Sequence, residues 1–264
     1  MTKKNIKILI VDDEEVVINS ISKIATMEGY SVDSVQDANS ALQQISVNNY
    51  DLIICDIMLP GMDGFQFLTE LESKRIATPV IMTTGYSTIE NAVKSLYTGA
   101  IEFIPKPFTV DEMISVISRG IKYSSIMKLK KSKDDSILVV PCPTKYFRLG
   151  YSGWMNQDHD GSVIIGATDI FIKTIEQIKK IELLGAKEKL TQATPAVKFE
   201  TEDGLIHQLY SVISGIILAR NERLISEPEL LEKDPYFDGW IYRIIPTEFE
   251  YEMKLLIPCS SDRS

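Results

Sequence analysis

Apolar and polar positions in the first half of the chain alternate between two kinds of segment. Short apolar runs have the length and composition of buried β-strands. Longer segments between them carry apolar residues at helical spacing, as Val17, Ile21 and Ile24 do in the first one. This alternation predicts a doubly wound, five-stranded parallel sheet of the α/β class. The predicted strands are Ile6–Val11, Ser31–Val35, Leu52–Asp56, Pro79–Thr83 and Ile101–Pro105, and the predicted helices are Glu14–Glu28, Ala38–Val47, Phe65–Ser73, Ser87–Tyr97 and one that begins at Val110 and can extend to Lys130.

The second half has shorter β-like runs separated by turn signals, which is typical of a small, mainly-β domain. The change of pattern divides the chain into a domain at 1–124, a charged helical linker at 125–136 and a second domain at 137–264. Helices are expected within 170–180 and near 248–255. The β-like runs are Tyr146–Leu149, Ser162–Ile165, Ala196–Glu200, Gly215–Ala219 and Gly239–Ile245, with turns at Asp158–Gly161 and Glu202–Gly204.

Charge is acidic in both halves. Residues 1–125 carry ten Lys and Arg against sixteen Asp and Glu (net −6), and residues 136–264 carry fourteen against nineteen (net −5). Nucleic-acid binding needs basic residues to neutralise phosphates, so the composition argues against it. The most apolar long stretch, Ile206–Ala219, is too short to span a bilayer, and the N-terminus does not resemble a signal peptide. We therefore expect a cytoplasmic protein with no membrane partner.

The three cysteines are too few for a paired disulfide framework. Cys55 lies inside a predicted buried strand, where a small core residue is expected. Cys142 and Cys259 each neighbour a proline near the ends of the second domain. A disulfide between these two is conceivable, but the interpretation favoured from the sequence leaves them unpaired.

Polar residues follow several of the predicted strands at their carboxyl ends. Asp12 and Asp13 follow the first, Asp56 closes the third, Thr84 comes after the fourth and Lys106 after the fifth. The carboxyl ends of parallel strands meet at one edge of a sheet, where ligands of α/β folds bind. Three carboxylates, a hydroxyl and an ammonium group suit a divalent cation and a phosphoryl group.

The segments VDDE, CDIMLPGMDG, TTGY and PKPF occur in this order, and residues 5 to about 123 resemble the receiver domain of a two-component response regulator. The resemblance implies a flavodoxin-like fold in which Asp56 accepts a phosphoryl group. Such domains catalyse only their own phosphorylation and dephosphorylation, so no other enzymatic activity is expected. The implied donor is a sensor histidine kinase or a phosphotransfer protein, and a phosphorylation-dependent homodimer is a further partner that the resemblance suggests.

The same resemblance assigns roles around Asp56. It implies that Mg²⁺ is held by Asp13 and Asp56, by Asp12 through water, and by the backbone carbonyl of Met58. Thr84 and Lys106 would contact the phosphoryl group, and the peptide bond before Pro107 would be cis. Phe103 occupies the position of the switch aromatic, although a simple core role would also explain it.

The segments GSVIIGATDIF, TPAVKFETEDGLIHQLYSVISG and SEPELLEKDPYFDGWIYRI resemble the H protein of the glycine cleavage system over residues 144–257. This resemblance implies a lipoyl-type β sandwich or barrel that carries lipoate on a lysine at a hairpin tip. That position falls on Gly204, counting back from Ser214-Gly215. Glycine has no amine, and Lys198 is expected within a strand. We therefore expect no lipoate on this domain.

The interpretation favoured by the sequence is a response regulator whose non-lipoylated output domain binds another, unidentified protein. A phospho-regulated metabolic or carrier module linked to glycine cleavage is the alternative, and the missing lysine opposes it. A transcription factor would need a helix-turn-helix segment and a basic face. His159, between Asp158 and Asp160, is interpreted as part of a hairpin turn and not as a metal ligand.

Overall fold

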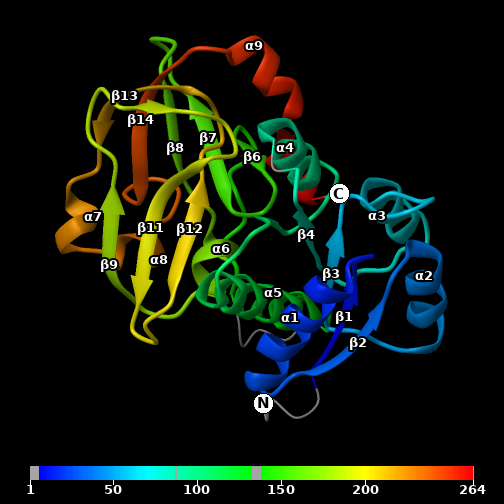
Figure 1. Cartoon of the computed structure of the whole chain (residues 1–264). Helices are drawn as coiled ribbons and strands as arrows, with labels where there is room; N and C mark the ends of the chain where they lie inside the picture. Colours follow the sequence, from blue (N-terminus) through cyan, green and yellow to red (C-terminus); the bar gives the residue numbers. More distant parts are fainter. Residues whose placement is uncertain (1–5, 87, 133–137, 264) are drawn as a thin grey trace. The chain divides into compact units, whose positions relative to one another are not determined.

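The computed structural model of the chain describes residues 6–86, 88–132 and 138–263 (Figure 1). The first residue of the predicted fourth helix, Ser87, and residues 133–137, where the linker and second domain were predicted to meet, lie outside this range. The chain divides into two compact units, one built on a parallel sheet and the other on antiparallel sheets.

The first unit contains a five-stranded parallel sheet in the order β2-β1-β3-β4-β5, which is the flavodoxin-like order and confirms the predicted fold. The interior strands β3 and β4 are buried along their whole length, as an all-parallel sheet covered on both faces requires. The strands are β1 (Lys7–Val11), β2 (Ser31–Val35), β3 (Leu52–Asp56), β4 (Val80–Thr84) and β5 (Glu102–Pro105).

Five helices follow the five strands. Polar caps begin three of them: Asp37 accepts a hydrogen bond from the Ser40 amide, and Asp63 and Thr109 each form a reciprocal capping box. These caps place the helix starts within one or two residues of the predicted ones. The helices are α1 (Glu15–Met27), α2 (Ala38–Val47), α3 (Gly64–Ser73), α4 (Ile89–Tyr97) and α5 (Val110–Lys131), and α1 and α5 run side by side (Figure 1).

The second unit contains a seven-stranded sheet in the order β10-β13-β14-β8-β7-β6-β15 and a three-stranded sheet in the order β12-β11-β9, both antiparallel. The Tyr242 hydroxyl on the larger sheet donates to the Ala196 carbonyl on the smaller one over 2.9 Å, and Phe199 is fully buried. The strands are β6 (Phe147–Leu149), β7 (Gly153–Gln157), β8 (Val163–Ala167), β9 (Ile178–Leu183), β10 (Lys189–Leu190), β11 (Pro195–Thr201), β12 (Ile206–Tyr210), β13 (Gly215–Arg220), β14 (Trp240–Pro246) and β15 (Ile257–Pro258).

Helices in this unit are short. The predicted helix within 170–180 is α6 and ends at Thr174; the following residues enter β9, because Ile178 and Ile181 pair with β11. Tertiary pairing therefore overrides the local helical pattern. Strands β7, β9, β10, β12 and β15 were not among the predicted β-like runs. The helices are α6 (Asp169–Thr174), α7 (Arg223–Ser226), α8 (Leu230–Lys233) and α9 (Phe249–Glu252), with 3₁₀ turns at Met253–Leu255 and Cys259–Arg263.

The expectation that Cys142 and Cys259 are unpaired is wrong. The two residues form a disulfide, with their Cα atoms 5.7 Å apart across 117 positions of sequence. Strand β15 pairs with β6, and the Cys259 amide donates to the Tyr146 carbonyl, so the end of the chain returns to the start of the domain. Sequence separation gave no sign of this pairing because only the sheet register brings the two segments together. Cys55 is a buried free thiol, as predicted.

Candidate functional site

The carboxyl edge of the parallel sheet gathers the charged residues that the sequence placed at strand ends. Strands β1 and β3 are neighbours, so Asp12, directly after β1, lies beside Asp56 at the end of β3. Both carboxylates are buried, with Asp12 1% and Asp56 3% exposed. Two buried carboxylates so placed repel each other, and a cation is needed to stabilise them.

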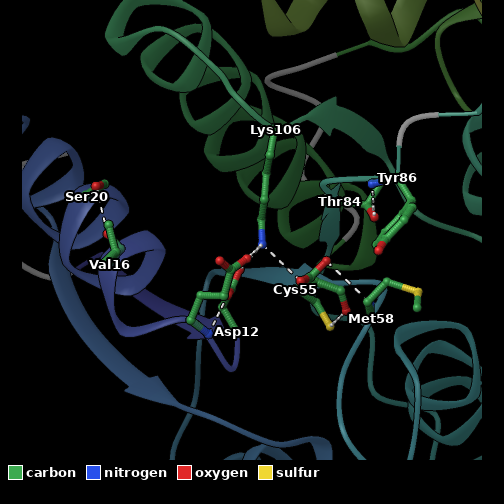
Figure 2. Close-up of polar contacts among 10 residues, drawn as sticks. Asp12, Val16, Ser20, Cys55, Met58, Thr84, Tyr86 and Lys106 are labelled. Carbon is green, nitrogen blue, oxygen red and sulfur yellow. Dashed lines mark hydrogen bonds and ion pairs between the residues drawn. The ribbon is translucent and has the colours of Figure 1, made fainter.

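Lys106 supplies positive charge to this pair (Figure 2). Its Nζ lies 2.8 Å from Asp12 Oδ2 and 2.9 Å from Asp56 Oδ2, and its side chain is only 10% exposed. Burial opposes protonation of the amine, but the hydrogen bonds and charges of the two carboxylates outweigh it and raise the pKa of Lys106 to about 12. Lys106 is therefore charged at neutral pH and directed at both carboxylates.

Asp12 experiences the opposite balance. Burial raises its pKa above the ordinary value, although hydrogen bonds from Lys106 and from the Glu14 amide lower it. The dominance of burial shows that one lysine does not fully offset the loss of water around this carboxylate. The site therefore favours additional positive charge.

A divalent cation fits the acidic residues of this edge. Asp12, Asp13 and Asp56 offer oxygen atoms that lie within 4.8 Å of one another, and this is the one such cluster of three found in the described part of the chain. Carboxylate oxygens are the ligands that Mg²⁺ prefers, and it keeps several waters. Asp13 is exposed, which leaves a solvent-facing side for those waters and for a phosphoryl group.

The remaining predicted site residues lie at or beside the same edge. Thr84 ends β4, is fully buried, and its hydroxyl accepts from the Tyr86 amide at 3.1 Å (Figure 2). The Met58 amide donates to Asp56 Oδ1 at 3.3 Å, while the Met58 side chain is exposed. Phe103 is buried within β5. The Lys106–Pro107 peptide bond is cis, which confirms that expectation.

Two contributors were not singled out from the sequence. Glu14 lies 3.3 Å from Lys106 Nζ and adds a further exposed carboxylate to the edge. Gly64 begins α3 against the end of β3, where a Cβ would lie 2.4 Å from the Asp56 backbone oxygen. Glu14 lies in the motif VDDE, and Gly64 is the last residue of CDIMLPGMDG. The sequence analysis recognised both motifs but gave no packing reason for this glycine.

The hairpin between β11 and β12 in the second unit carries no comparable chemistry. Gly204 sits at its tip with φ +81°, and a Cβ there would meet nothing within 4 Å. The Thr201 hydroxyl donates to the Asp203 carboxylate at 2.6 Å and the Gly204 amide to the Thr201 carbonyl at 2.9 Å, which makes a tight acidic turn. Lys198 lies within β11, as expected.

The Asp158–Gly161 turn is closed by Arg243. Arg243 Nη2 lies 2.7 Å from Asp158 Oδ2 and Nη1 lies 3.3 Å from Asp160 Oδ2. His159 between them is exposed. A guanidinium therefore already neutralises these two carboxylates, in agreement with the interpretation of the segment as a turn.

Comparison with known families follows the division seen in the fold. Residues 8–118 match the family model of the response regulator receiver domain, and residues 145–260 match that of the glycine cleavage H-protein. The chain thus carries a receiver domain followed by a domain of the H-protein family, as the two resemblances implied.

Relatives of the receiver segment are regulatory proteins. The transcriptional regulatory protein TcrA of Mycobacterium tuberculosis is 34% identical over 110 residues, which cover 42% of this chain and 44% of that protein. The nitrogen assimilation regulatory protein NtrX of Azorhizobium caulinodans is 37% identical over 117 residues, covering 44% of this chain and 26% of that protein. The chain therefore spans less than half the length of these relatives.

Solved structures of receiver domains match a similar share of the chain. A CheY-like receiver domain from Methanospirillum hungatei is 33% identical, covers 46% of this chain and 98% of its own, and gives a TM-score of 0.44. The NtrX receiver domain of Brucella abortus is 37% identical, covers 43% of this chain and 97% of its own, and gives a TM-score of 0.42.

None of the helices in the described ranges has the length and apolarity needed to cross a membrane.

Proposed function

We propose that the protein is a response regulator of a two-component phosphorelay, and that Asp56 accepts the phosphoryl group. The observation that supports this most directly is the Lys106 ammonium, 2.9 Å from Asp56 and 2.8 Å from Asp12 at one sheet edge. Such a group stabilises negative charge that develops on a phosphoryl oxygen. Mg²⁺, when bound by Asp13 and Asp56, would neutralise the phosphoryl oxygens and the attacking carboxylate.

The side chains have distinct roles in the proposed reaction. An oxygen of the Asp56 carboxylate attacks the phosphorus of a phosphohistidine, the bond to the donor nitrogen breaks, and an acyl phosphate results. Lys106 balances the added charge, and the Thr84 hydroxyl donates a hydrogen bond to a phosphoryl oxygen. Phe103, buried before phosphorylation, would be the ring whose position changes with Thr84. The donor is a sensor histidine kinase or a phosphotransfer protein.

The second domain is proposed to act as a binding module without lipoate. Its hairpin tip presents Gly204, which has no nucleophile to acylate, and Lys198 is held in the middle of a paired strand. The scaffold is nevertheless well packed around Phe199 and Tyr242, both fully buried. A folded lipoyl-type domain without its arm supports a protein contact as its remaining use. We place the domains at 1–124 and 137–264 and the protein in the cytoplasm.

Asp56→Asn tests the phosphoryl acceptor. Incubation of the full chain with a small phosphodonor and Mg²⁺ should add one phosphoryl mass to the parent and none to the variant. Asp111→Asn, which changes an exposed acid in the first turn of α5, is the matched control and should label like the parent. Equal labelling of Asp56→Asn and the parent would contradict the assignment of Asp56.

A further inference from the structure

The disulfide Cys142–Cys259 joins the two ends of the second unit. Cys142 lies in the entering segment Pro141-Cys142-Pro143, and Cys259 follows the last strand, 117 positions later. Neither the phosphoryl chemistry of the first unit nor the missing lysine of the second accounts for a covalent tie at this place. A cross-link that closes a long loop lowers the conformational entropy of the unfolded chain and so stabilises the folded one.

The β-pairing of the segment that carries Cys259 is short. Strand β15 has only two residues, Ile257 and Pro258, paired with Arg148 and Phe147 of β6. The Cys259 amide adds one backbone hydrogen bond to the Tyr146 carbonyl. A two-residue strand at the edge of a sheet opens easily, so the disulfide is a principal restraint on this end of the chain.

The disulfide also covers an aromatic cluster. Cys142 and Cys259 are 6% and 0% exposed and pack with Trp154 and Tyr236. Tyr146 lies against both rings, with centroids 4.9 Å from Trp154 and 6.4 Å from Tyr236. If the Cys259 segment moved away, these large apolar rings would lose their cover.

We propose that Cys142 and Cys259 are a reversible thiol–disulfide site, and that their redox state determines whether the C-terminal segment stays closed over the aromatic cluster. Prolines on both sides of Cys142 and directly before Cys259 restrict the backbone of the reduced segments. The two thiols therefore remain close enough to pair again, while the short β15 allows a reductant to reach the buried bond.

The chemistry uses a low-molecular-weight disulfide as oxidant. A thiolate of the pair attacks one sulfur of that disulfide, forming a mixed disulfide and releasing one small thiolate. The second cysteine thiolate attacks the mixed disulfide, forms the Cys142–Cys259 bond and releases the second small thiolate. Two electrons pass from the pair to the oxidant, and the two cysteine protons are taken up by the released thiolates.

The third cysteine is isolated from this exchange. Cys55 is a free thiol, fully buried in β3 of the other sheet. Burial keeps reagents away from Cys55 in the folded protein. It serves as an internal reference for thiol counting after unfolding.

Redox titration of the full chain tests the proposal. The protein is equilibrated in mixtures of reduced and oxidised glutathione, quenched, alkylated under denaturing conditions and weighed. The expected result is a reversible change between one and three alkylated cysteines within the range of mixtures, reached from both directions. A pair that stays oxidised in excess reduced glutathione, or stays reduced in excess oxidised glutathione, overturns the proposal.

Structural readouts test the movement of the C-terminal segment. Both tryptophans of the chain, Trp154 and Trp240, pack at this cluster, so intrinsic fluorescence reports on it and should change with the redox state. Hydrogen exchange of residues 256–260 should accelerate at least about tenfold on reduction. Equal exchange in the two states contradicts the closing role.

Variants separate the bond from other effects of reductant. The double variant Cys142→Ser with Cys259→Ser should show the exchange of the reduced parent and no response to reductant. Cys55→Ala, the matched control, should respond like the parent. A response of the double variant equal to that of the parent would overturn the assignment to this pair. The outcome is independent of Asp56, because none of these measurements involves phosphorylation.

Discussion

The carboxyl edge of the parallel sheet and the tip of the β11–β12 hairpin differ in the chemistry they present. The edge holds Lys106 within 3 Å of two buried carboxylates, together with an exposed acid, Asp13. The tip holds Gly204 in open space, directly after Asp203, whose carboxylate accepts hydrogen bonds from the Thr201 hydroxyl and the Leu205 amide. The two family resemblances imply a reactive group at each of these places. In the proposed function only the sheet edge carries one, the carboxylate of Asp56.

This difference teaches that a fold and its function are separable within one chain. The buried residues that define the second domain are packed as well as those of the first, and the domain family is recognisable over residues 145–260. The resemblance to the H protein implies a lipoyl lysine at the hairpin tip, where this chain has Gly204. Function must therefore be argued from the site and not from the scaffold.

The largest expected effect is an all-or-none modification. The parent chain should carry no lipoyl adduct when lipoate and lipoylating enzymes are supplied, because Gly204 offers no amine. Gly204→Lys places an amine where a Cβ meets nothing within 4 Å and is expected to gain the adduct. Intact mass measures both. An adduct on the parent would contradict the proposed loss, whereas an unmodified variant would mean that the tip has lost more than its lysine.

The next effect concerns Mg²⁺ at the sheet edge. Asp13→Ala should weaken Mg²⁺ binding at least about tenfold, because it removes one carboxylate ligand and one negative charge. Calorimetric titration of the full chain measures the affinity. Glu14→Ala is the matched control, since Glu14 is adjacent, exposed and contacts Lys106 without belonging to the three-carboxylate cluster. Equal losses in the two variants would exclude a ligand role specific to Asp13.

A pair of glycine substitutions compares the two regions directly. At Gly64 an added Cβ would lie 2.4 Å from the backbone oxygen of Asp56. Gly64→Ala should therefore lower the unfolding free energy of the first unit by about 3 kcal/mol. Gly204→Ala meets no neighbour and should cost the second unit about 1 kcal/mol, for its left-handed backbone alone. Urea unfolding of each variant gives both values. A larger cost at Gly204 would reverse the comparison.

The last expected effect is a pH dependence. The pKa of Lys106 is raised to about 12 from 10.5 by its carboxylates, so its contribution to stability is complete below pH 10.5 and is lost as the pH rises through about 12. That contribution amounts to about 2 kcal/mol. The difference in unfolding free energy between the parent and Lys106→Met, measured in chelator, should shrink by this amount over the interval. A constant difference would contradict the coupling.

Much of the first unit could be predicted from sequence because its information is local. Apolar runs of strand length, helical spacing between them and capping residues such as Asp63 and Thr109 act within a few positions of chain. The site followed from topology, since parallel strands place their carboxyl ends together. The distances within the site, the position of Lys106 between Asp12 and Asp56, and the close approach of Gly64 to the Asp56 backbone depend on tertiary packing. The spacing of these residues in the sequence does not predict them.

The sequence by itself determined the strand-ending acids, the parallel sheet, the two domain families and the glycine at the hairpin tip. Each of these features depends on the residue type at one position or on a short repeating pattern of apolar residues. Only the tertiary structure decided that residues 178–180 join a strand and not a helix, because pairing with β11 outweighs local preference. It also decided that Cys142 bonds with Cys259. These two residues, 117 positions apart in sequence, come together only because the short strands β15 and β6 pair in the folded domain.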